Sequence, residues 1–394
     1  MRIHEVLENE TLADIAKKYG IFEEDLKKVN GITDEACAVG EELLIISPTR
    51  THTARHGDTL ERLCLRYRVR KNDLLALNPT IKRNSLEAGQ RVALKYDERT
   101  HGMAVTNGCV YKGTSLSALE ESLPYMTYAT FASVCAERGG FKRIFDEGEL
   151  LLRVKKENKI PLLKIYDSYS ERYEKGDLDA FCKKIIELAK ERGYKGIVLN
   201  STAFNDSAEK YSRFLMDLKK SMIGEDLILI TECDERSPKE YSDIGDGAVF
   251  SYGKLWCEPM PSFADGERRA IVDFACDAES IKSFIELPSF ARLNDGCIDI
   301  EGAKKIARKE KCRVCHDKSA RTLFFDSTKG KCTYPSLQNI KAVLELLSEY
   351  GFMGISFDVS RTPAVYLAMY NAMFKTISYG GITSPEGCNR GCAR

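Results

Sequence analysis

The chain has 394 residues, which is longer than one ordinary domain, and 43% of them are hydrophobic, enough to build sizeable cores. Its 59 basic residues are balanced by 59 acidic ones, which argues against a nucleic-acid-binding protein, because such proteins depend on a clustered excess of cations. No apolar run reaches the roughly 18 residues that a membrane span needs. The first twelve residues lack the basic start and apolar run of a secretory signal peptide. We therefore expect synthesis in the cytoplasm, with no nucleic-acid or membrane partner.

The first hundred residues contain an internal repeat with a period of 48 positions. The residues that recur are Thr11, Leu12, Ile15, Tyr19, Asp25, Leu26 and Asn30, which return as Thr59, Leu60, Leu63, Tyr67, Asp73, Leu74 and Asn78. The hydrophobic spacing predicts a strand, two short helices and a second strand in each copy. These elements cover residues 3–7, 12–20, 23–29 and 40–47, and then 51–56, 60–68, 71–78 and 89–96. We expect two small β-α-α-β modules, over residues 1–48 and 51–96.

Both copies resemble LysM modules in three places. The first loop reads Asn9-Glu10-Thr11-Leu12 and Gly57-Asp58-Thr59-Leu60, the loop after the second helix holds Asn30 and Asn78-Pro79, and Gly40-Glu41 and Gly89-Gln90 lead into the last strand. The resemblance implies binding of N-acetylglucosamine glycans such as peptidoglycan or chitin, in a shallow groove between the first two loops. The loop residues named here are then the glycan-binding candidates. Thr11 and Thr59 also suit the plain role of helix N-caps.

A polar segment over residues 96–102 indicates a linker, after which apolar strand-like runs alternate with amphipathic helices. The eight runs cover Met103–Tyr111, Thr127–Val134, Pro161–Ile165, Gly196–Asn200, Leu227–Thr231, Ala248–Tyr252, Ala270–Phe274 and Gly354–Phe357. The helices include residues 178–192, 208–222, 278–286 and 337–350. Eight βα units over about 280 residues are typical of a (β/α)8 TIM barrel, here over residues 103–382.

Residues 287–336 are too many for a simple loop between the seventh and eighth strands. We expect a small α+β insertion there, with a hairpin over Leu323–Tyr334 that turns at Thr328-Lys329-Gly330. The polar, glycine-rich segment 383–394 forms a cysteine-containing tail.

The barrel segment resembles family-18 glycoside hydrolases. The segments that carry this resemblance are GCVY, LPYMTYATF, ERGYKGIVLN, AVFSYGKLW and EYGFMGISF. Together with the LysM-like modules, they are most similar to the spore-associated N-acetylglucosaminidases of spore-forming bacteria. The resemblance covers nearly the whole chain, and it implies a protein of the spore coat or cortex.

The catalytic motif of that family is altered in this chain. The family's fourth strand carries Asp-Gly-x-x-x-Asp-x-Glu, in which the Glu protonates the glycosidic oxygen and the second Asp orients the substrate's N-acetyl group, which is the nucleophile. Aligned on this pattern, the first Asp is Lys195, the orienting Asp is Asn200 and the acid Glu is Thr202. A threonine hydroxyl cannot be a general acid near neutral pH. We therefore expect a barrel without hydrolytic residues.

Other strand ends supply the remaining candidates. The family's sixth strand ends in Met-x-Tyr-Asp and its eighth in Trp, whereas this chain has Tyr252-Gly253 and Asp358 at those places. The predicted pocket at the barrel mouth consists of Tyr111, Asn200, Tyr252, Trp256 and Asp358. A displaced acid could restore hydrolysis, and the rim carboxylates that could serve are Asp167, Asp206, Glu232 and Asp234. Each of these is equally typical of a solvated rim residue or a helix cap.

Fourteen cysteines are many for a reducing compartment and too scattered for a small disulfide scaffold. Cys312-Arg313-Val314-Cys315-His316 has the spacing of a c-type haem site, but haem attachment needs export. A zinc site would need Cys312 and Cys315 with two of Cys332, Cys388 and Cys392. We expect neither metal nor cofactor. Cys388 and Cys392 suit disulfides with other coat proteins, and most remaining cysteines suit buried thiols.

The leading functional prediction is a peptidoglycan-binding protein with a non-hydrolytic barrel. One competing prediction is a cortex-lytic N-acetylglucosaminidase that uses a displaced acid. A third is a pocket in the barrel that binds a small molecule or a protein partner.

Overall fold

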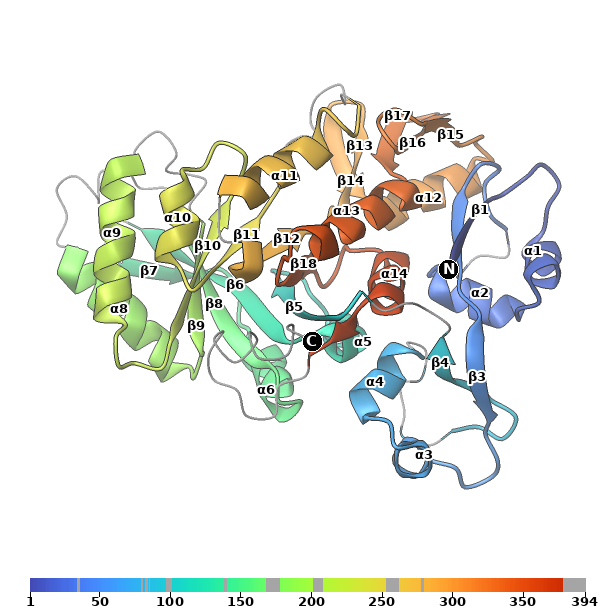
Figure 1. Cartoon of the computed structure of the whole chain (residues 1–394), viewed down its shortest axis with the longest axis horizontal. Helices are drawn as coiled ribbons and strands as arrows, with labels where there is room; N and C mark the ends of the chain where they lie inside the picture. Colours follow the sequence, from blue (N-terminus) through green and yellow to red (C-terminus); the bar gives the residue numbers. More distant parts are fainter. Residues whose placement is uncertain are drawn as a thin grey trace.

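The computed structural model describes residues 1–33, 36–78, 81, 84, 86–96, 101–137, 140–167, 178–200, 208–252, 262–277 and 280–377. Figure 1 shows a barrel surrounded by helices, with the two N-terminal repeats stacked along one side of it. In the described part of the chain, no helix combines the length and apolar character needed to cross a bilayer.

The first repeat folds as β1 (Arg2–Glu5), α1 (Leu12–Tyr19), α2 (Glu23–Val29) and β2 (Glu42–Ile45). β1 and β2 pair antiparallel. Thr11 caps α1 through a capping box with Asp14, as predicted from the sequence. A small core that includes Leu12, Ile15 and Leu26 fills the space between the helices and this two-stranded sheet.

The second repeat has the same order of elements: β3 (Pro48–Thr53), α3 (Leu60–Tyr67), α4 (Lys71–Ala76) and β4 (Arg91–Tyr96). Its strands pair antiparallel and its core includes Leu60, Leu63 and Leu74, the counterparts of the first core. The Arg91 guanidinium lies 3.8 Å from the centre of the Phe22 ring and 3.6 Å from an oxygen of Asp25, so it ties the two repeats together.

Eight parallel strands close into a barrel. They are β5 (Met103–Val110), β6 (Tyr128–Glu137), β8 (Ile160–Tyr166), β9 (Gly196–Asn200), β10 (Ile228–Cys233), β11 (Gly247–Phe250), β12 (Ser283–Glu286) and β18 (Gly354–Asp358). The pairings of β5 with both β6 and β18 complete the circle. Two short strands extend the sheet: β7 (Gly140–Arg143) on β6 and β19 (Lys375–Thr376) on β5. The predicted fold class is confirmed.

The helices that surround the barrel pack their apolar faces on its outer surface. They are α5 (Leu116–Ser122) with the 3-10 turn η1 (Leu123–Tyr125), α6 (Gly148–Lys156), α8 (Leu178–Glu191), α9 (Ala208–Ser221), α10 (Lys239–Ile244), α11 (Glu267–Asp277), α13 (Leu337–Glu349) and α14 (Ala364–Met373). The large core between helices and strands includes Phe131, Phe214 and Ile355. A second core, with Val105, Leu162 and Val198, fills the barrel interior.

The prediction of the seventh strand was wrong. Ala270–Phe274 lies inside α11, and the residues predicted as helix 278–286 contain instead the 3-10 turn η4 (Ser280–Lys282) and strand β12. Within the apolar run only Ile271 is fully buried, which fits a helix with one face on the core. β12 is short, and its alternation places Phe284 in the barrel interior and Ile285 outside, a pattern too brief to recognise in the sequence.

The predicted insertion between the last two barrel strands is confirmed. It contains β13 (Phe290–Leu293), β14 (Gly296–Asp299), α12 (Ile300–Lys309), β15 (Cys315–Asp317), β16 (Thr322–Ser327) and β17 (Gly330–Pro335). Its strands form one antiparallel sheet in the order β14-β13-β17-β16-β15. The hairpin between β16 and β17 turns where the sequence predicted.

The first repeat docks on this insertion. Arg308 of α12 makes a two-pronged contact with Glu41, 2.5 Å from Nη2 to Oε1 and 3.0 Å from Nε to Oε2, and both side chains are buried. The Val314 amide donates to the Val39 carbonyl at 2.8 Å, and the His316 ring lies 2.9 Å from the Gly40 carbonyl. The first repeat and the insertion therefore share a buried polar interface.

A buried carboxyl group beside the insertion makes stability depend on pH. Glu267 accepts a hydrogen bond from the Asn339 side chain, and burial raises the pKa of Glu267 from 4.5 to about 7. The folded state holds this proton more tightly than the unfolded chain, so the stabilisation is complete below about pH 4.5 and is lost as the pH rises through about 7. The loss can reach about 1.4 kcal/mol per pH unit. We expect Glu267→Gln to weaken the pH dependence of the free energy of unfolding in this range, measured by urea unfolding from pH 4 to 8.

The matched control is Glu349→Gln, which changes an exposed glutamate of α13 and should leave the pH dependence as in the wild type. If the free energy of unfolding depends on pH in the same way in Glu267→Gln and in the wild type, Glu267 is not the group responsible.

Candidate functional site

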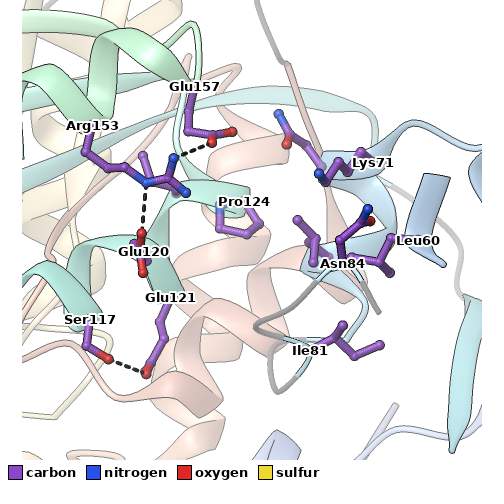
Figure 2. A pocket seen from close by; sticks show the side chains of 13 residues that line it. Leu60, Lys71, Ile81, Asn84, Ser117, Glu120, Glu121, Pro124, Arg153 and Glu157 are labelled. Carbon is purple, nitrogen blue, oxygen red and sulfur yellow. Dashed lines mark hydrogen bonds and ion pairs between the residues drawn. The ribbon is translucent and has the colours of Figure 1, made fainter. Parts of the chain in front are cut away.

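In the second repeat, the loop before α3 and the loop after α4 lie against each other. The Leu60 amide donates to the Asn84 carbonyl at 2.9 Å, and the Leu86 amide donates to the Asp58 carbonyl at 3.3 Å. A cavity of about 170 Å³ opens beside Leu60, Ile81 and Asn84, and α5 and α6 of the barrel form its opposite side (Figure 2). The two predicted glycan-binding loops therefore form one continuous edge.

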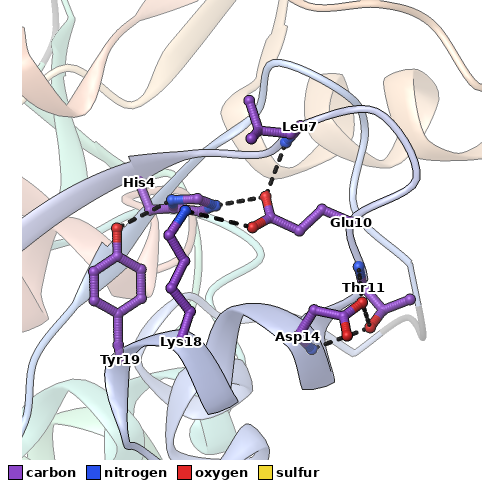
Figure 3. A network of polar contacts seen from close by, with 7 residues as sticks. All are labelled: His4, Leu7, Glu10, Thr11, Asp14, Lys18 and Tyr19. Carbon is purple, nitrogen blue, oxygen red and sulfur yellow. Dashed lines mark hydrogen bonds and ion pairs between the residues drawn. The ribbon is translucent and has the colours of Figure 1, made fainter.

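The acidic residue of the first loop is held by a histidine in both repeats. In the first repeat, Glu10 lies 2.7 Å from the His4 ring, whose other nitrogen lies 3.2 Å from the Tyr19 hydroxyl (Figure 3). Burial raises the pKa of Glu10, but hydrogen bonds from the Leu7 amide and His4 outweigh it, and the pKa is lowered.

The second repeat has the same arrangement 48 positions later. The His52 ring lies 2.8 Å from Asp58 and 2.9 Å from the Tyr67 hydroxyl. The Arg55 amide and then His52 lower the pKa of Asp58. These acidic residues brace their loops together with His4 and His52, whose 48-residue spacing is visible in the sequence but was not used in the prediction.

In each repeat, an asparagine (Asn30 or Asn78) stabilises the loop after the second helix from its buried side. The Asn30 side chain donates to the carbonyls of Leu26 and Leu44, each at 2.9 Å, and accepts from the Leu44 amide at 2.7 Å. Asn78 makes the equivalent bonds with Leu74 and Ala93. Both asparagines are buried, so their side chains shape the loop and do not face a ligand. Pro79 lies outside the described residues.

At the first loop, Asn9 and Gly57 occupy equivalent positions and both have a left-handed backbone, with φ of 61° and 83°. Asn9 and Gly57 are exposed, whereas Leu12 and Leu60 are buried in the module cores. Thr11 and Thr59 accept hydrogen bonds from the amides of Asp14 and Arg62, so both threonines are N-caps.

Inside the barrel, a polar layer lies above the apolar core, towards the carboxyl ends of the strands. Alternation along each strand places every second residue on the inner face, so the strands whose Leu162, Ile230 and Phe284 fill the core present Lys164, Glu232 and Glu286 one step further on. Asn107 accepts from the Thr130 hydroxyl at 2.7 Å and donates to Ser356 at 3.3 Å in the same layer.

Lys164 and Glu232 form an ion pair in this layer. Lys164 Nζ lies 2.5 Å from Glu232 Oε1, and only 6% of the lysine side chain and 15% of the glutamate side chain are exposed. The ammonium also lies 5.5 Å from the ring centre of Tyr111 and 4.9 Å from that of Tyr166. Burial lowers the pKa of Lys164, but Glu232 outweighs it and the pKa is raised well above its usual value. The cation is therefore fixed among the strand ends.

Glu286 is the other carboxyl group of the layer. Burial and the nearby Glu232 raise the pKa of Glu286, against the lowering effects of a hydrogen bond with Ser251 and of Lys164. Such an environment favours a carboxyl that retains its proton, as a general acid must. The sequence analysis missed both Lys164 and Glu286. The lysine was visible as one charge inside the apolar run PLLKIY.

Comparison with known proteins identifies the N-terminal part. The family model described as LysM domain matches residues 4–45 and 52–95. The chain contains two LysM domains. A Bacillus subtilis protein with the name "Putative sporulation-specific glycosylase YdhD" is 32% identical over 94 residues, which are 24% of this chain and 22% of that relative. The chain thus matches less than a quarter of the relative's length.

Two solved structures superpose on nearly the whole chain, and a third superposes on about two thirds of it. The spore cortex-lytic enzyme SleL of Bacillus cereus superposes with a TM-score of 0.73 over 96% of this chain and 100% of its own, at 19% sequence identity. SleL of Bacillus megaterium gives a TM-score of 0.72 over 96% and 99%, at 16% identity. A chitinase of Chromobacterium violaceum gives 0.60 over 68% of this chain and 98% of its own, at 11% identity. At these identities the likeness establishes the fold.

Lys195 and Asn200, which align with the catalytic motif of family-18 glycoside hydrolases, lie at opposite ends of β9. Asn200 ends β9 on the inner side, two residues after Val198 of the barrel core, and is in register with Glu232. Lys195 precedes the strand at its other end and pairs with Asp226 at 3.0 Å, so it does not belong to the barrel mouth. Thr202 lies outside the described residues.

The carboxylates predicted as replacement acids differ in their contacts and burial. Glu232 pairs with Lys164. Asp234 is buried and accepts hydrogen bonds from the Arg236 amide and the Ser237 hydroxyl, each at 3.0 Å, so it stabilises the turn after β10. Asp167 is buried directly after β8. Asp206 lies outside the described residues.

Of the predicted mouth pocket, Tyr111 lies beside Lys164. Asp358 is buried at the end of β18 and accepts from the amides of Ser360 and Arg361 at 2.8 and 3.1 Å. The placement of Tyr252 was wrong: it is fully buried in the core between strands and helices with Phe250, because Ser251 takes the inner position. Trp256 lies outside the described residues.

The cysteine candidates remain separate. Cys312, Cys315 and Cys332 have free thiols. Among the same residues, no three His, Cys, Asp or Glu side chains group as a metal site would require. Cys312 and Cys315 thus have no third described ligand such as Cys332, and Cys388 and Cys392 lie outside the described part.

Proposed function

We propose that this protein binds an N-acetylglucosamine polymer, peptidoglycan of the spore cortex, through its LysM domains, and that its barrel does not hydrolyse the glycan. The match of both repeats to the LysM domain carries the binding part of the proposal. Backbone amides and carbonyls of the LysM loops can pair with N-acetyl groups and hydroxyls, so a neutral glycan needs no charged group for recognition.

The chemistry of the barrel mouth supports the non-hydrolytic part. Asn200 replaces the carboxylate that orients the N-acetyl group, and an amide cannot stabilise the positive charge that develops on the sugar. Lys164 forms an ion pair with Glu232 in the same layer, so this candidate for a displaced acid is already held by a cation.

The test is co-sedimentation of the full-length protein with purified cortex peptidoglycan, with an assay of the supernatant for new reducing ends. We expect the wild type to sediment with the glycan and to release no reducing ends. Thr202→Glu returns the missing acid, and general acid catalysis typically contributes about 10²–10⁴-fold. We expect it to remain inactive, because Asn200 is unchanged. Reducing ends released by the wild type would overturn the non-hydrolytic assignment, and failure to sediment would overturn glycan binding.

One observation favours a hydrolase as the second candidate. Glu286 has the raised pKa of a proton donor and faces the barrel interior. If the wild type releases reducing ends, Glu286→Gln should abolish the release, whereas Glu349→Gln on the surface should not.

We also propose a location in the spore coat or cortex. The similarity to a protein named as a sporulation-specific glycosylase and to spore cortex-lytic enzymes supports it. Disulfides to other coat proteins would use exposed thiols, and Cys276 is exposed in addition to the tail cysteines considered above.

A further inference from the structure

The cavity beside the second LysM domain has walls from two different domains. Leu60, Asn72, Ile81 and Asn84 line it from the LysM side, and helices α5 and α6 with the turn η1 line it from the barrel side (Figure 2). A ligand held by the LysM loops would therefore also touch the outer surface of the barrel.

The barrel wall is a fixed set of polar groups on an apolar base. Arg153 of α6 lies 2.9 Å from Glu120 of α5 and 2.8 Å from Glu157, which holds the guanidinium across the two helices. Those contacts use Nε and Nη1, and Nη2 has no further bond to the described residues. The Pro124 ring beside it gives the barrel wall an apolar surface, and Leu60 and Ile81 across the cavity are almost fully buried.

This mixture of groups fits a sugar better than an ion or an apolar ligand. Pyranose rings present C–H faces that pack on apolar side chains, and hydroxyl and amide groups that need donors and acceptors at the edges. Asn72 and the Arg153–Glu120–Glu157 cluster supply both kinds of polar group. The acidic residues of the wall offset Arg153 and Lys71, so no excess of positive charge selects an anion.

The first LysM domain has a different setting. Its α1 lies on the side remote from the barrel, and Asn9 and Thr11 of its first loop are exposed (Figure 1). The first loop of the first LysM domain is therefore open, whereas the equivalent edge of the second domain faces α5 and α6 of the barrel.

We propose that α5 and α6 of the barrel form part of the glycan-binding site of the second LysM domain and contact an N-acetylated sugar unit bound there. The barrel then contributes to binding with its outer surface, whatever its interior does. This inference rests on the proposed glycan binding, and it assigns α5 and α6 to the binding site as its second side.

The experiment is hydrogen exchange of the full-length protein with and without N-acetylchitotetraose. We expect slower exchange in the LysM loops and also in residues 116–125 and 148–157 of the barrel wall. Arg153→Ala should remove the protection of the barrel wall and weaken the affinity of this site by about three- to tenfold, as loss of one hydrogen-bonding group does. Lys156→Ala is the matched control, because it removes a positive charge from the same helix outside the cavity.

The outcomes separate the two proposals. Protection confined to the LysM loops, unchanged by Arg153→Ala, would overturn the composite site and leave glycan binding intact. No protection anywhere, together with no sedimentation on peptidoglycan, would overturn glycan binding itself.

Discussion

Replacing Lys164 by Met should lower the free energy of unfolding by about 3 kcal/mol, because it leaves Glu232 in the barrel mouth without its cation. The methionine fills most of the same volume, so the loss reports the charge more than the packing. Urea unfolding of the full-length protein at pH 7 measures the difference.

Two variants make this result specific. Lys190→Met removes a lysine from a more exposed ion pair with Glu225 and should cost less than about 1 kcal/mol. Glu232→Gln in the Lys164→Met background should recover most of the lost stability, because no buried charge then remains unpaired. Equal losses of stability for Lys164→Met and Lys190→Met would show that the ion pair of Lys164 with Glu232 is solvated and does not fix the strand ends.

Gly40→Ala should destabilise the protein far more than Gly89→Ala, although the two glycines occupy the same turn of the two LysM domains. Both have a left-handed backbone, with φ of 83° and 88°, so a side chain costs about 1–2 kcal/mol at either position. At Gly40 a Cβ atom would also lie 1.9 Å from the Val314 carbonyl oxygen, whereas at Gly89 it meets no atom within 4 Å. We expect the clash to add about 1–3 kcal/mol.

Urea unfolding gives the total loss for each variant, and limited proteolysis shows whether the first LysM domain has separated from the insertion. Gly89→Ala serves as the internal control for backbone strain. Equal losses at the two positions would mean that the contact of Gly40 with the insertion does not stabilise the docked arrangement.

Most of the fold could be predicted, because long-range order in this chain follows from local periodicity. The 48-residue repeat defined the two small modules, and seven of the eight barrel strands were placed by their apolar runs. β12 was missed because four residues cannot show a period, and Ala270–Phe274 was mistaken for a strand because one buried side of a helix reads as an apolar run.

The site was less predictable, because it depends on which face of a strand each residue occupies. Tyr252 was assigned to the mouth by its place in a motif, yet the inner position belongs to Ser251. Asn30 and Asn78 were predicted to contact the ligand, but their side chains form hydrogen bonds with backbone groups. Glu286 lies on the strand that was not recognised, so its role could not be predicted.

The buried pair of Glu41 and Arg308, together with Arg91 between the repeats, has a consequence for avidity. Glycan modules on flexible tethers search for neighbouring sugars at an effective concentration set by the tether, commonly millimolar. Here the two LysM grooves keep a set separation and direction. A glycan whose repeat matches that geometry gains from both grooves at once, and one that does not match gains from a single groove. If both domains bind glycan as proposed, the affinity depends on the spacing of the sugar units as well as on their chemistry.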